Sequence, residues 1–279
     1  MNVIRVLSVV GSLGLTYGLG SFESLHWLWQ LPVFFLCFWI AQILLFLGVL
    51  YLWCARIDLD TPSVENSRDR KVLNLCADFA LSFLHVKVHA TGMEKLPTEG
   101  RFLLVCNHLS LLDPVVLIAQ TKKSQLAFIS KQENKTMPFV NRLMHQTQCQ
   151  LLNRENDREA LKTILNCIAL IKEDKASIAV FPEGYTSRTG HLQPFRNGVF
   201  KIAQRSKVPI VVCTVQNTNL GFRNFLHGRR THVKLDLLEV IQPEELAGTT
   251  KEIGDHVHSI MAHNLGEPEV DNGPQGVVE

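Results

Sequence analysis

The sequence lacks any strong excess of one charge and any regular arrangement of cysteines. It carries 28 Lys and Arg residues against 26 Asp and Glu residues, and the net charge of +2 argues against a nucleic-acid partner held by charge. The seven cysteines are scattered, odd in number and mostly set in apolar runs, at positions 37, 54, 76, 106, 149, 167 and 213. No C-x-x-C pair occurs. The sequence therefore predicts reduced thiols in a cytoplasm-facing protein, without a disulfide framework or a metal site.

Two familiar site motifs are missing as well. There is no G-x-S-x-G turn, which presents the nucleophilic serine of many hydrolases. The glycines between Gly11 and Gly20 neither form G-x-G-x-x-G nor follow a strand pattern, which excludes a dinucleotide-binding turn there. Closely spaced glycines in an apolar helix instead favour tight contact with a second helix.

The longest apolar run, residues 31–55, contains no charged residue and only Gln42 as a strongly polar one. At about 25 residues it is long enough to span a bilayer, and Trp27, Trp29 and Trp53 flank it at positions suited to the two interfaces. The first twenty residues are also apolar, with Arg5 as their only charge. We therefore predict a membrane anchor over residues 1–55, built as a helix pair. A signal peptide and a buried core helix are the alternatives.

Charge on either side of the apolar run predicts its orientation. One arginine precedes the run, whereas four cations follow it, namely Arg56, Arg68, Arg70 and Lys71. The positive-inside bias places the main domain on the cytoplasmic side of the cell membrane. Residues 56–72 are predicted to be a polar linker, residues 73–265 the main domain, and residues 266–279, rich in Gly, Pro and acidic residues, a disordered tail.

From residue 73 onward, short β-like runs alternate with helical patterns. The predicted strands cover residues 86–90, 102–106, 126–130, 148–152, 177–181, 208–215 and 233–240, and the predicted helices cover residues 157–174, 198–206 and 249–265. The strand at 233–240 alternates apolar and polar positions, which is typical of a half-exposed strand. Asn156 with Glu159 three residues later resembles a capping box at the start of the first helix. This alternation predicts an α/β fold with a largely parallel central sheet flanked by helices.

The run 102–106 leads into Asn107-His108-Leu109-Ser110-Leu111-Leu112-Asp113-Pro114. An imidazole can take a proton near neutral pH, and a carboxylate can fix its tautomer. Residues five apart on one helix point about 140° apart, so His108 and Asp113 can meet only if the chain turns between a strand and a following helix. Asp before Pro also favours a helix start. Two interpretations stay open here: a His–Asp pair, or a helix-capping Asp113 with a loop histidine.

A second polar loop follows the predicted strand at 177–181. It reads Phe181-Pro182-Glu183-Gly184-Tyr185-Thr186-Ser187-Arg188. Pro182 ends the strand, Gly184 permits an unusual turn, and the Arg188 guanidinium suits a phosphate group. The alternative is an ordinary polar loop in which Glu183 and Arg188 pair with each other.

Together, the two motifs N-H-x4-D and F-P-E-G resemble those of the glycerolipid acyltransferase family, typified by lysophosphatidate acyltransferase. Asn107, His108 and Asp113 match the first motif, and residues 181–184 match the second. Between them, Lys131-Gln132-Glu133 with Pro138-Phe139, and then Asn153-Arg154, resemble the family's acceptor-phosphate region. Val208-Pro209-Ile210 matches its fourth block. The resemblance covers about residues 80–220, and an N-terminal helix pair also fits it.

The resemblance implies a membrane enzyme that moves a fatty acyl group from an acyl thioester to the free hydroxyl of lysophosphatidate. His108 is expected to be the base and Asp113 its partner, with no covalent intermediate, no cofactor and no metal. The residues expected to form the substrate site are Asn107, Lys131, Arg154, Glu183, Gly184 and Arg188. The expected partners are membrane lipids, the lysophospholipid acceptor, and acyl-CoA or acyl carrier protein as donor.

One departure concerns the acceptor. The family commonly reads F-P-E-G-T-R-S-R, whereas here Tyr185 and Thr186 replace Thr and the first Arg. Another lysophospholipid or glycerol-3-phosphate is therefore an alternative acceptor. A thioesterase that uses Ser110 beside His108 and a non-catalytic lipid-binding protein are the rival functions.

A basic cluster precedes the last predicted strand. It comprises Arg223, His227, Arg229, Arg230 and His232. It is either a solvated loop or a docking site for anionic lipid or an acidic acyl carrier protein.

Overall fold

The computed structural model divides the chain into two units, Met1–Thr61 and Pro62–Glu279. It describes residues 2–59, 67–137, 140–153 and 156–268. Parts of the predicted linker (60–66) and tail (269–279) lie outside the described residues, as do Pro138, Phe139 and Arg154.

The first unit is a pair of packed helices, α1 (Asn2–Gly18) and α2 (Trp27–Ala55), joined through a short 3-10 turn at Ser21–Glu23. A Cβ on Gly11 would lie 3.1 Å from the Phe38 ring, so the missing side chain lets the helices approach. The Gln42 amide Nε2 donates to Ser8 Oγ at 2.8 Å across the pair. Among the described residues, α2 is the one helix long and apolar enough to cross a membrane, and its most apolar segment is wholly unburied.

The second unit is built on a seven-stranded sheet in the order β1-β7-β6-β2-β5-β3-β4. The strands are β1 (Val86–Thr91), β2 (Leu103–Cys106), β3 (Leu126–Lys131), β4 (Gln150–Leu152), β5 (Ser177–Val180), β6 (Ile210–Gln216) and β7 (Thr231–Ile241). All neighbouring pairs are parallel except β6 and β7, which run antiparallel. This confirms the predicted largely parallel sheet.

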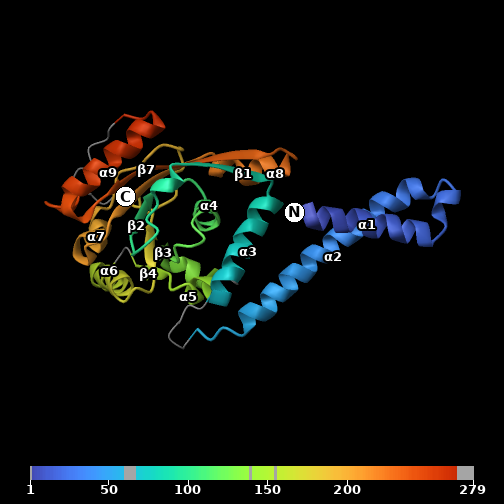
Figure 1. Ribbon diagram of the computed structural model, residues 1–279, viewed down its shortest axis with the longest axis horizontal. Coiled ribbons are helices and arrows are strands. Elements are labelled where there is room, and N and C mark those ends of the chain that lie inside the picture. Colours follow the sequence, from blue (N-terminus) through green and yellow to red (C-terminus); the bar gives the residue numbers. More distant parts are fainter. Residues whose placement is uncertain (1, 60–66, 138–139, 154–155, 269–279) are drawn as a thin grey trace. The chain divides into compact units, whose positions relative to one another are not determined.

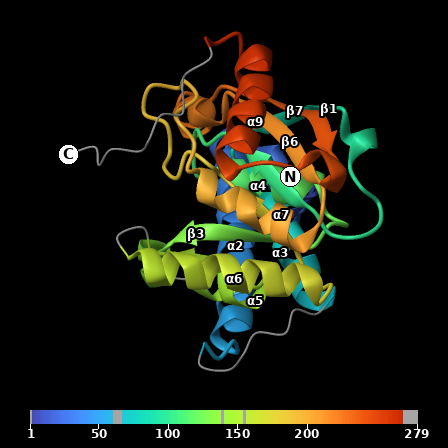
Figure 2. The same cartoon turned by 90° about the vertical axis from the view of Figure 1, so that its left-hand side faces the viewer.

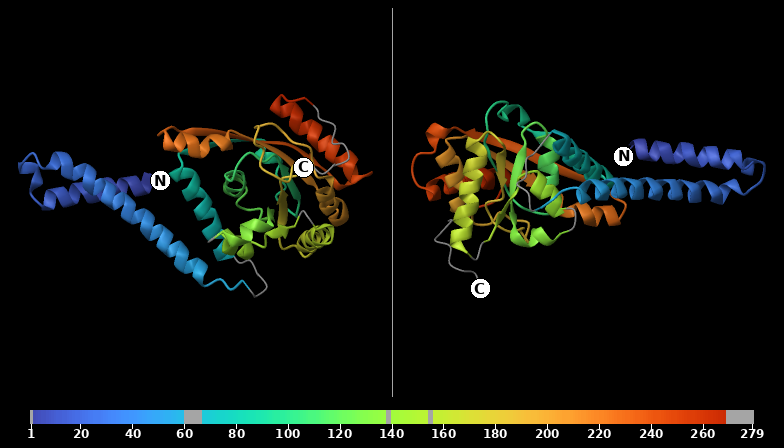
Figure 3. Two further views of the ribbon diagram at one scale, coloured as in Figure 1. Left: turned by 180° about the vertical axis from the view of Figure 1, so that it is seen from behind. Right: turned by 90° about the horizontal axis from the view of Figure 1, so that it is seen from below.

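Helices cover both faces of this sheet (Figure 1). They are α3 (Ser67–Phe83), α4 (Asp113–Gln120), α5 (Val140–Gln146), α6 (Asp157–Lys172), α7 (Lys201–Ser206), α8 (Gly221–Leu226) and α9 (Thr250–Leu265), with 3-10 turns at Met93–Lys95, Gln132–Thr136, Asn197–Phe200, Thr218–Leu220 and Pro243–Glu245. Helices α6, α7 and α9 cover one face, toward the viewer in Figure 2. Helices α3 and α4 pack on the opposite face, as the views in Figure 3 also show.

Burial along the strands follows from these two layers. The central strands β2 and β5 are buried at every position, because helices cover both of their faces. Alternate β2 residues enter different cores: Leu103 and Val105 pack with α6 and α9, while Leu104 and Cys106 pack with α3 and α4. Strand β7 begins with the alternation expected of a half-exposed strand.

All seven predicted strands are present, with ends shifted by one or two residues. Helices α6 and α9 occupy the predicted segments, whereas the predicted helix at 198–206 is divided into a 3-10 turn (Asn197–Phe200) and α7. The Asn156 side chain caps α6 by accepting from the N–H groups of Arg158 and Glu159, at 3.1 and 3.3 Å. The Glu159 carboxylate instead accepts from the Asn153 side chain, so the reciprocal half of the predicted capping box is missing.

Two predicted boundaries need correction. Residues 67–72, assigned to the linker, form the first turns of α3, where the Arg70 guanidinium is buried and donates to the carbonyl of Leu126 at 3.1 Å. At the other end, Gly266 ends α9, and the Glu267 carboxylate accepts from the Leu192 N–H at 2.7 Å. The start of the predicted tail is therefore bound to the domain.

Candidate active site

The polar loops identified in the sequence meet at one edge of the sheet. Strands β2, β3, β5 and β6 are mutually parallel, so their carboxyl ends share this edge. His108 follows β2, Phe181 follows β5, Lys131 ends β3 and Thr218 follows β6. In open α/β sheets, ligands bind in the crevice outside these strand ends.

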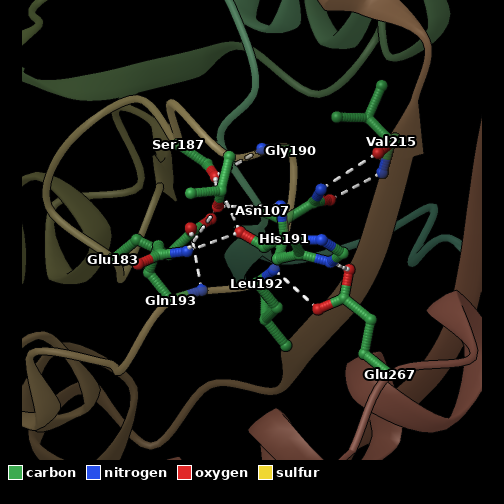
Figure 4. A network of polar contacts seen from close by, with 10 residues as sticks. Asn107, Glu183, Ser187, Gly190, His191, Leu192, Gln193, Val215 and Glu267 are labelled. Carbon is green, nitrogen blue, oxygen red and sulfur yellow. Dashed lines mark hydrogen bonds and ion pairs between the residues drawn. The ribbon is translucent and has the colours of Figure 1, made fainter.

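Asn107 extends the pairing of β2 with β6 beyond the last strand residue. Its side-chain Nδ2 donates to the Val215 carbonyl at 3.0 Å, and its Oδ1 accepts from the Val215 N–H at 2.7 Å (Figure 4). Asn107 is buried, so these bonds satisfy groups that water does not reach. Asn107, predicted to contact substrate, lies under His108 and holds the chain there.

His108 and Asp113 form the predicted pair, with His108 Nδ1 at 2.7 Å from Asp113 Oδ2. A carboxylate accepts, so Nδ1 carries the proton and Nε2 presents a lone pair. The His108 side chain is 15% exposed, which leaves it within reach of a ligand, and its ring stacks on Phe181 at a centroid distance of 4.2 Å.

The helix-cap interpretation of Asp113 is wrong. Helix α4 begins at Asp113 itself, and Leu112 occupies the N-cap position without a side-chain cap bond. The Asp113 carboxylate turns back to the preceding loop, where Oδ2 also accepts from the N–H groups of Leu109 at 2.6 Å and Ser110 at 2.8 Å. Its Oδ1 accepts from the Thr218 hydroxyl. Four donors thus hold a fully buried carboxylate in one orientation toward His108.

Glu183 lies beneath the two loops and is 1% exposed. Its Oε1 accepts from the backbone N–H of His108 at 2.6 Å, and its Oε2 accepts from the Gln193 N–H at 3.1 Å. Burial raises the pKa of Glu183 to about 8, against the opposing effect of these two bonds. Glu183 therefore joins the β5 loop to the histidine loop. The polar-loop alternative required Glu183 to pair with Arg188, and the two side chains do not pair.

Gly184 adopts a left-handed backbone conformation with φ of +83°. A Cβ there would lie 2.9 Å from Cδ and Nε of Arg196, so the turn needs glycine for both conformation and space. Its backbone N–H donates to the Phe181 carbonyl at 3.1 Å. The glycine thus reverses the chain directly after β5.

The rest of this loop is fastened to the histidine loop. The Ser187 N–H donates to the His108 carbonyl at 2.8 Å, and Ser187 Oγ donates to the His191 carbonyl at 2.7 Å (Figure 4). Arg188 is exposed one residue further on, and among the described residues it has no hydrogen bond or ion pair. Tyr185 is exposed as well, with its hydroxyl 3.4 Å from Gln193 Oε1.

Of the two remaining predicted phosphate ligands, the structure describes Lys131 alone. Lys131 ends β3 at the same sheet edge and is half-buried. Arg154 lies outside the described residues.

Ser110 does not have the geometry of an activated nucleophile. Its hydroxyl oxygen accepts from the Leu112 N–H at 3.0 Å, and its backbone N–H donates to Asp113. Ser110 and His108 are both described, and no hydrogen bond joins their side chains. Within the described ranges there is also no group of three or more His, Cys, Asp or Glu side chains that could hold a metal ion.

Two residues of this site were not identified from the sequence. Thr218 reaches Asp113 across 105 positions of the chain, and Gln193 meets Glu183 through its backbone. Neither carries a charge or belongs to a recognisable motif. Only the crossover from β6 into the following 3-10 turn brings Thr218 to this place.

Comparison with known proteins agrees with this geometry. The model of the Acyltransferase family matches residues 87–216. The 1-acyl-sn-glycerol-3-phosphate acyltransferase of Borreliella burgdorferi is 26% identical over 182 residues, which is 65% of this chain and 72% of that protein. The Escherichia coli protein of the same name is 28% identical over 186 residues, 65% and 74% of the two chains. The Saccharomyces cerevisiae one is 31% identical over 138 residues, 49% and 45%.

A solved structure has a similar fold. The crystal structure of the 1-acyl-sn-glycerophosphate (LPA) acyltransferase from Thermotoga maritima superimposes with a TM-score of 0.59. The match covers 71% of this chain and 78% of that chain at 24% identity.

Proposed function

We propose that this protein transfers a fatty acyl group from an acyl thioester to lysophosphatidate, forming phosphatidate in phospholipid biosynthesis, because residues 87–216 match the Acyltransferase family and the named relatives carry this activity in their names. The observation that carries the proposal is the His108–Asp113 pair, which lies at the carboxyl edge of the sheet with the ring Nδ1 2.7 Å from the carboxylate. The names of the relatives support lysophosphatidate as the acceptor, and the His–Asp pair supports base-assisted acyl transfer.

The pair suits direct transfer between the two substrates. His108 Nε2 removes the proton of the free glycerol hydroxyl as its oxygen bonds to the thioester carbonyl carbon. Asp113 stabilises the imidazolium that forms. The tetrahedral intermediate then expels the thiolate as the C–S bond breaks, and the thiolate takes the proton from the His108 imidazolium. The ester bond replaces the thioester, so the reaction needs no cofactor and no metal.

Cationic side chains on the β5 loop and at the end of β3 suit an acceptor that carries a phosphate. Arg188 extends into solvent from the β5 loop, and Lys131 ends β3 at the same edge. A guanidinium binds phosphate through two hydrogen bonds, whereas an ammonium acts as a point charge. We assign phosphate binding to these two residues and to Arg154. Glu183, Gly184 and Asn107 shape the site from beneath.

A lipid acceptor agrees with an N-terminal membrane anchor. We assign anchoring to α2, which is long and apolar enough to cross a bilayer. We infer from the cations that follow it that the catalytic domain faces the cytoplasm. Both acceptor and product would then remain in the membrane that holds the enzyme.

The acceptor is tested with purified full-length protein in detergent micelles. Lysophosphatidate, other lysophospholipids and glycerol-3-phosphate are each offered with acyl-CoA or acyl carrier protein, and products are identified by mass spectrometry. We expect phosphatidate from lysophosphatidate. Acylation of only another acceptor would overturn the substrate assignment, and release of free fatty acid alone would show a thioesterase.

A further inference from the structure

Helix α8 exposes large apolar side chains to solvent. Phe222 is 51% exposed and Leu226 is 81% exposed. Residues four apart lie on one face of a helix, so these two form a single apolar strip. An apolar strip exposed on a helix is typical of a binding surface.

The other side of α8 is fixed to the domain. The Phe225 ring lies 5.1 Å from the Phe83 ring of α3, measured between centroids. Gly221 packs so closely on the histidine loop that a Cβ would lie 2.3 Å from Leu112 Cδ1. The strip is therefore held outward by contacts on the opposite side of the helix.

Cations surround the apolar strip, and acids are missing from this part of the sequence. Arg223, Arg229 and Arg230 are exposed, and residues 217–235 contain no Asp or Glu. His232 and Lys234 are exposed on the adjoining β7, where His232 lies in register with exposed Lys87 of β1. The nearest acid along β7, Asp236, accepts from the Thr91 hydroxyl at 2.6 Å. We call Phe222, Leu226, Arg223, Arg229 and Arg230 the α8 surface.

The α8 surface adjoins the candidate active site. The helix follows directly on the 3-10 turn whose Thr218 donates to Asp113, and Gly221 touches Leu112 of the histidine loop. Leu111 in that loop is itself 63% exposed. Apolar side chains are thus exposed both on α8 and beside His108.

We propose that the α8 surface docks the catalytic domain onto an anionic lipid surface, so that the histidine loop meets the plane of the bilayer. Cations attract the lipid headgroups, and Phe and Leu side chains enter the boundary between headgroups and acyl chains. The exposed Phe222 and Leu226 suit a lipid surface, because apolar side chains beside cations are typical of helices that lie in the membrane interface. The α8 surface would also mark where a lipid acceptor enters the site. This part of the proposal rests on the proposed function, whereas docking to lipid does not.

Docking is measured by hydrogen exchange on the full-length protein in nanodiscs of phosphatidylcholine alone and of phosphatidylcholine with phosphatidylglycerol. We expect slower exchange of peptides covering residues 221–230 in the anionic nanodiscs. Each neutralised cation near such a bilayer should lower the docked-to-free ratio about fivefold, so Arg229→Gln with Arg230→Gln should lower it about 25-fold. Phe222→Ser with Leu226→Ser should reduce the protection as well.

The matched control is Lys201→Gln with Arg205→Gln, which removes two exposed cations of α7. It should leave the protection of residues 221–230 unchanged. Equal exchange in the two nanodiscs, or equal loss in the α7 control, would overturn the proposal. Protection that appears only on adding acidic carrier protein would overturn it too and assign the surface to that partner.

If the proposed function is wrong but the docking proposal is right, the hydrogen-exchange experiment and the acyl-transfer assay will disagree. His108→Ala should keep the lipid-dependent protection, since it leaves the α8 surface intact. A protein that docks but forms no phosphatidate would retain the surface and lose the substrate assignment.

Discussion

Asp113 shows how single residues define the candidate site. Its carboxylate is fully buried and accepts from a ring nitrogen, two backbone N–H groups and the Thr218 hydroxyl. Three of these donors share Oδ2, so Thr218 alone holds Oδ1. Rotation of the carboxylate therefore depends on one hydroxyl from a distant part of the chain.

Replacing Thr218 tests this dependence. Thr218→Val keeps the shape but leaves a buried carboxylate oxygen without a donor, at a cost of about 1–3 kcal/mol. We expect kcat to fall about tenfold or more, with little change in KM and a shifted pH profile of kcat/KM, because the imidazole loses its fixed partner. Thr218→Ser keeps the hydroxyl and should restore the activity. Equal kinetics for the Val variant and the wild type would contradict the role of Thr218.

Glu183 makes stability depend on pH. Its pKa is raised from 4.5 to about 8, chiefly by burial. The folded protein thus keeps a proton that the unfolded chain releases, and stability falls as the pH rises from 4.5 toward 8. Relative to Glu183→Gln, which cannot titrate, the free energy of unfolding of the wild type should fall by up to about 1.4 kcal/mol per pH unit in this interval.

The measurement is urea unfolding in detergent across that interval. Glu133→Gln, a change at an exposed carboxylate, serves as the control and should follow the wild type. Parallel pH dependences for wild type and Glu183→Gln would show that Glu183 is ionised in the folded protein.

At this scale, the sequence predicts what lies within a motif and misses what the fold brings from elsewhere. The contact of His108 with Asp113 is one of two interpretations that the strand end, the turn and the Asp-Pro helix start between residues 106 and 114 allow. Thr218 could not be predicted, because nothing in its local pattern differs from an ordinary turn. The sequence also assigns Glu183 to the site, but its two backbone partners depend on how two loops meet.

Among the elements, the end of β2 depends on Asn107. Its amide exchanges two hydrogen bonds with the backbone of Val215 and so prolongs the pairing with β6 by one position. This places His108 at the edge of the sheet.

Truncating Asn107 should weaken both stability and activity. Asn107→Ala leaves the buried N–H and carbonyl of Val215 without partners, which costs about 1–3 kcal/mol for each unsatisfied group. We expect an unfolding free energy lower by about 2 kcal/mol or more and a loss of acyl transfer, measured by denaturation and turnover on one preparation. Asn166→Ala, which removes an exposed amide of α6, is the control. A variant as stable as the wild type would show that Asn107 does not hold the strand.

Element prediction succeeds where periodicity is strong. Residues alternate between buried and exposed at the start of β7 because helices cover one of its faces there, and β5 is buried at every position because helices cover both of its faces. The antiparallel direction of β7 does not follow, because strand patterns carry no direction. The start of α3 resembles a linker because its first turns are rich in charge, although Asp69 and Arg70 are buried in the domain.

For the whole molecule, the two units have different chemistry. The N-terminal pair exposes apolar side chains along both helices, while the second unit buries its apolar side chains in two layers around a sheet. The first pattern suits lipid and the second suits water.

Charge introduced into α2 should release the protein from membranes. A lysine at the centre of a spanning helix raises the free energy of inserting that helix into a bilayer by about 3 kcal/mol. Leu44→Lys with Leu45→Lys should therefore move the full-length chain from the membrane pellet to the soluble fraction after alkaline extraction. Leu44→Ile with Leu45→Ile is the matched control and should stay in the pellet. Retention of the lysine variant would exclude α2 as a spanning anchor.

Loss of phosphatidate synthesis on removing His108 is the most direct test of the central claim. Purified wild-type protein and His108→Ala are given lysophosphatidate with acyl-CoA or acyl carrier protein, and phosphatidate is quantified by mass spectrometry. Removing the base should slow acyl transfer about 10²–10⁴-fold while leaving the fold intact. We expect phosphatidate from the wild type and this loss in the variant. Equal rates of phosphatidate formation by the two proteins would contradict it.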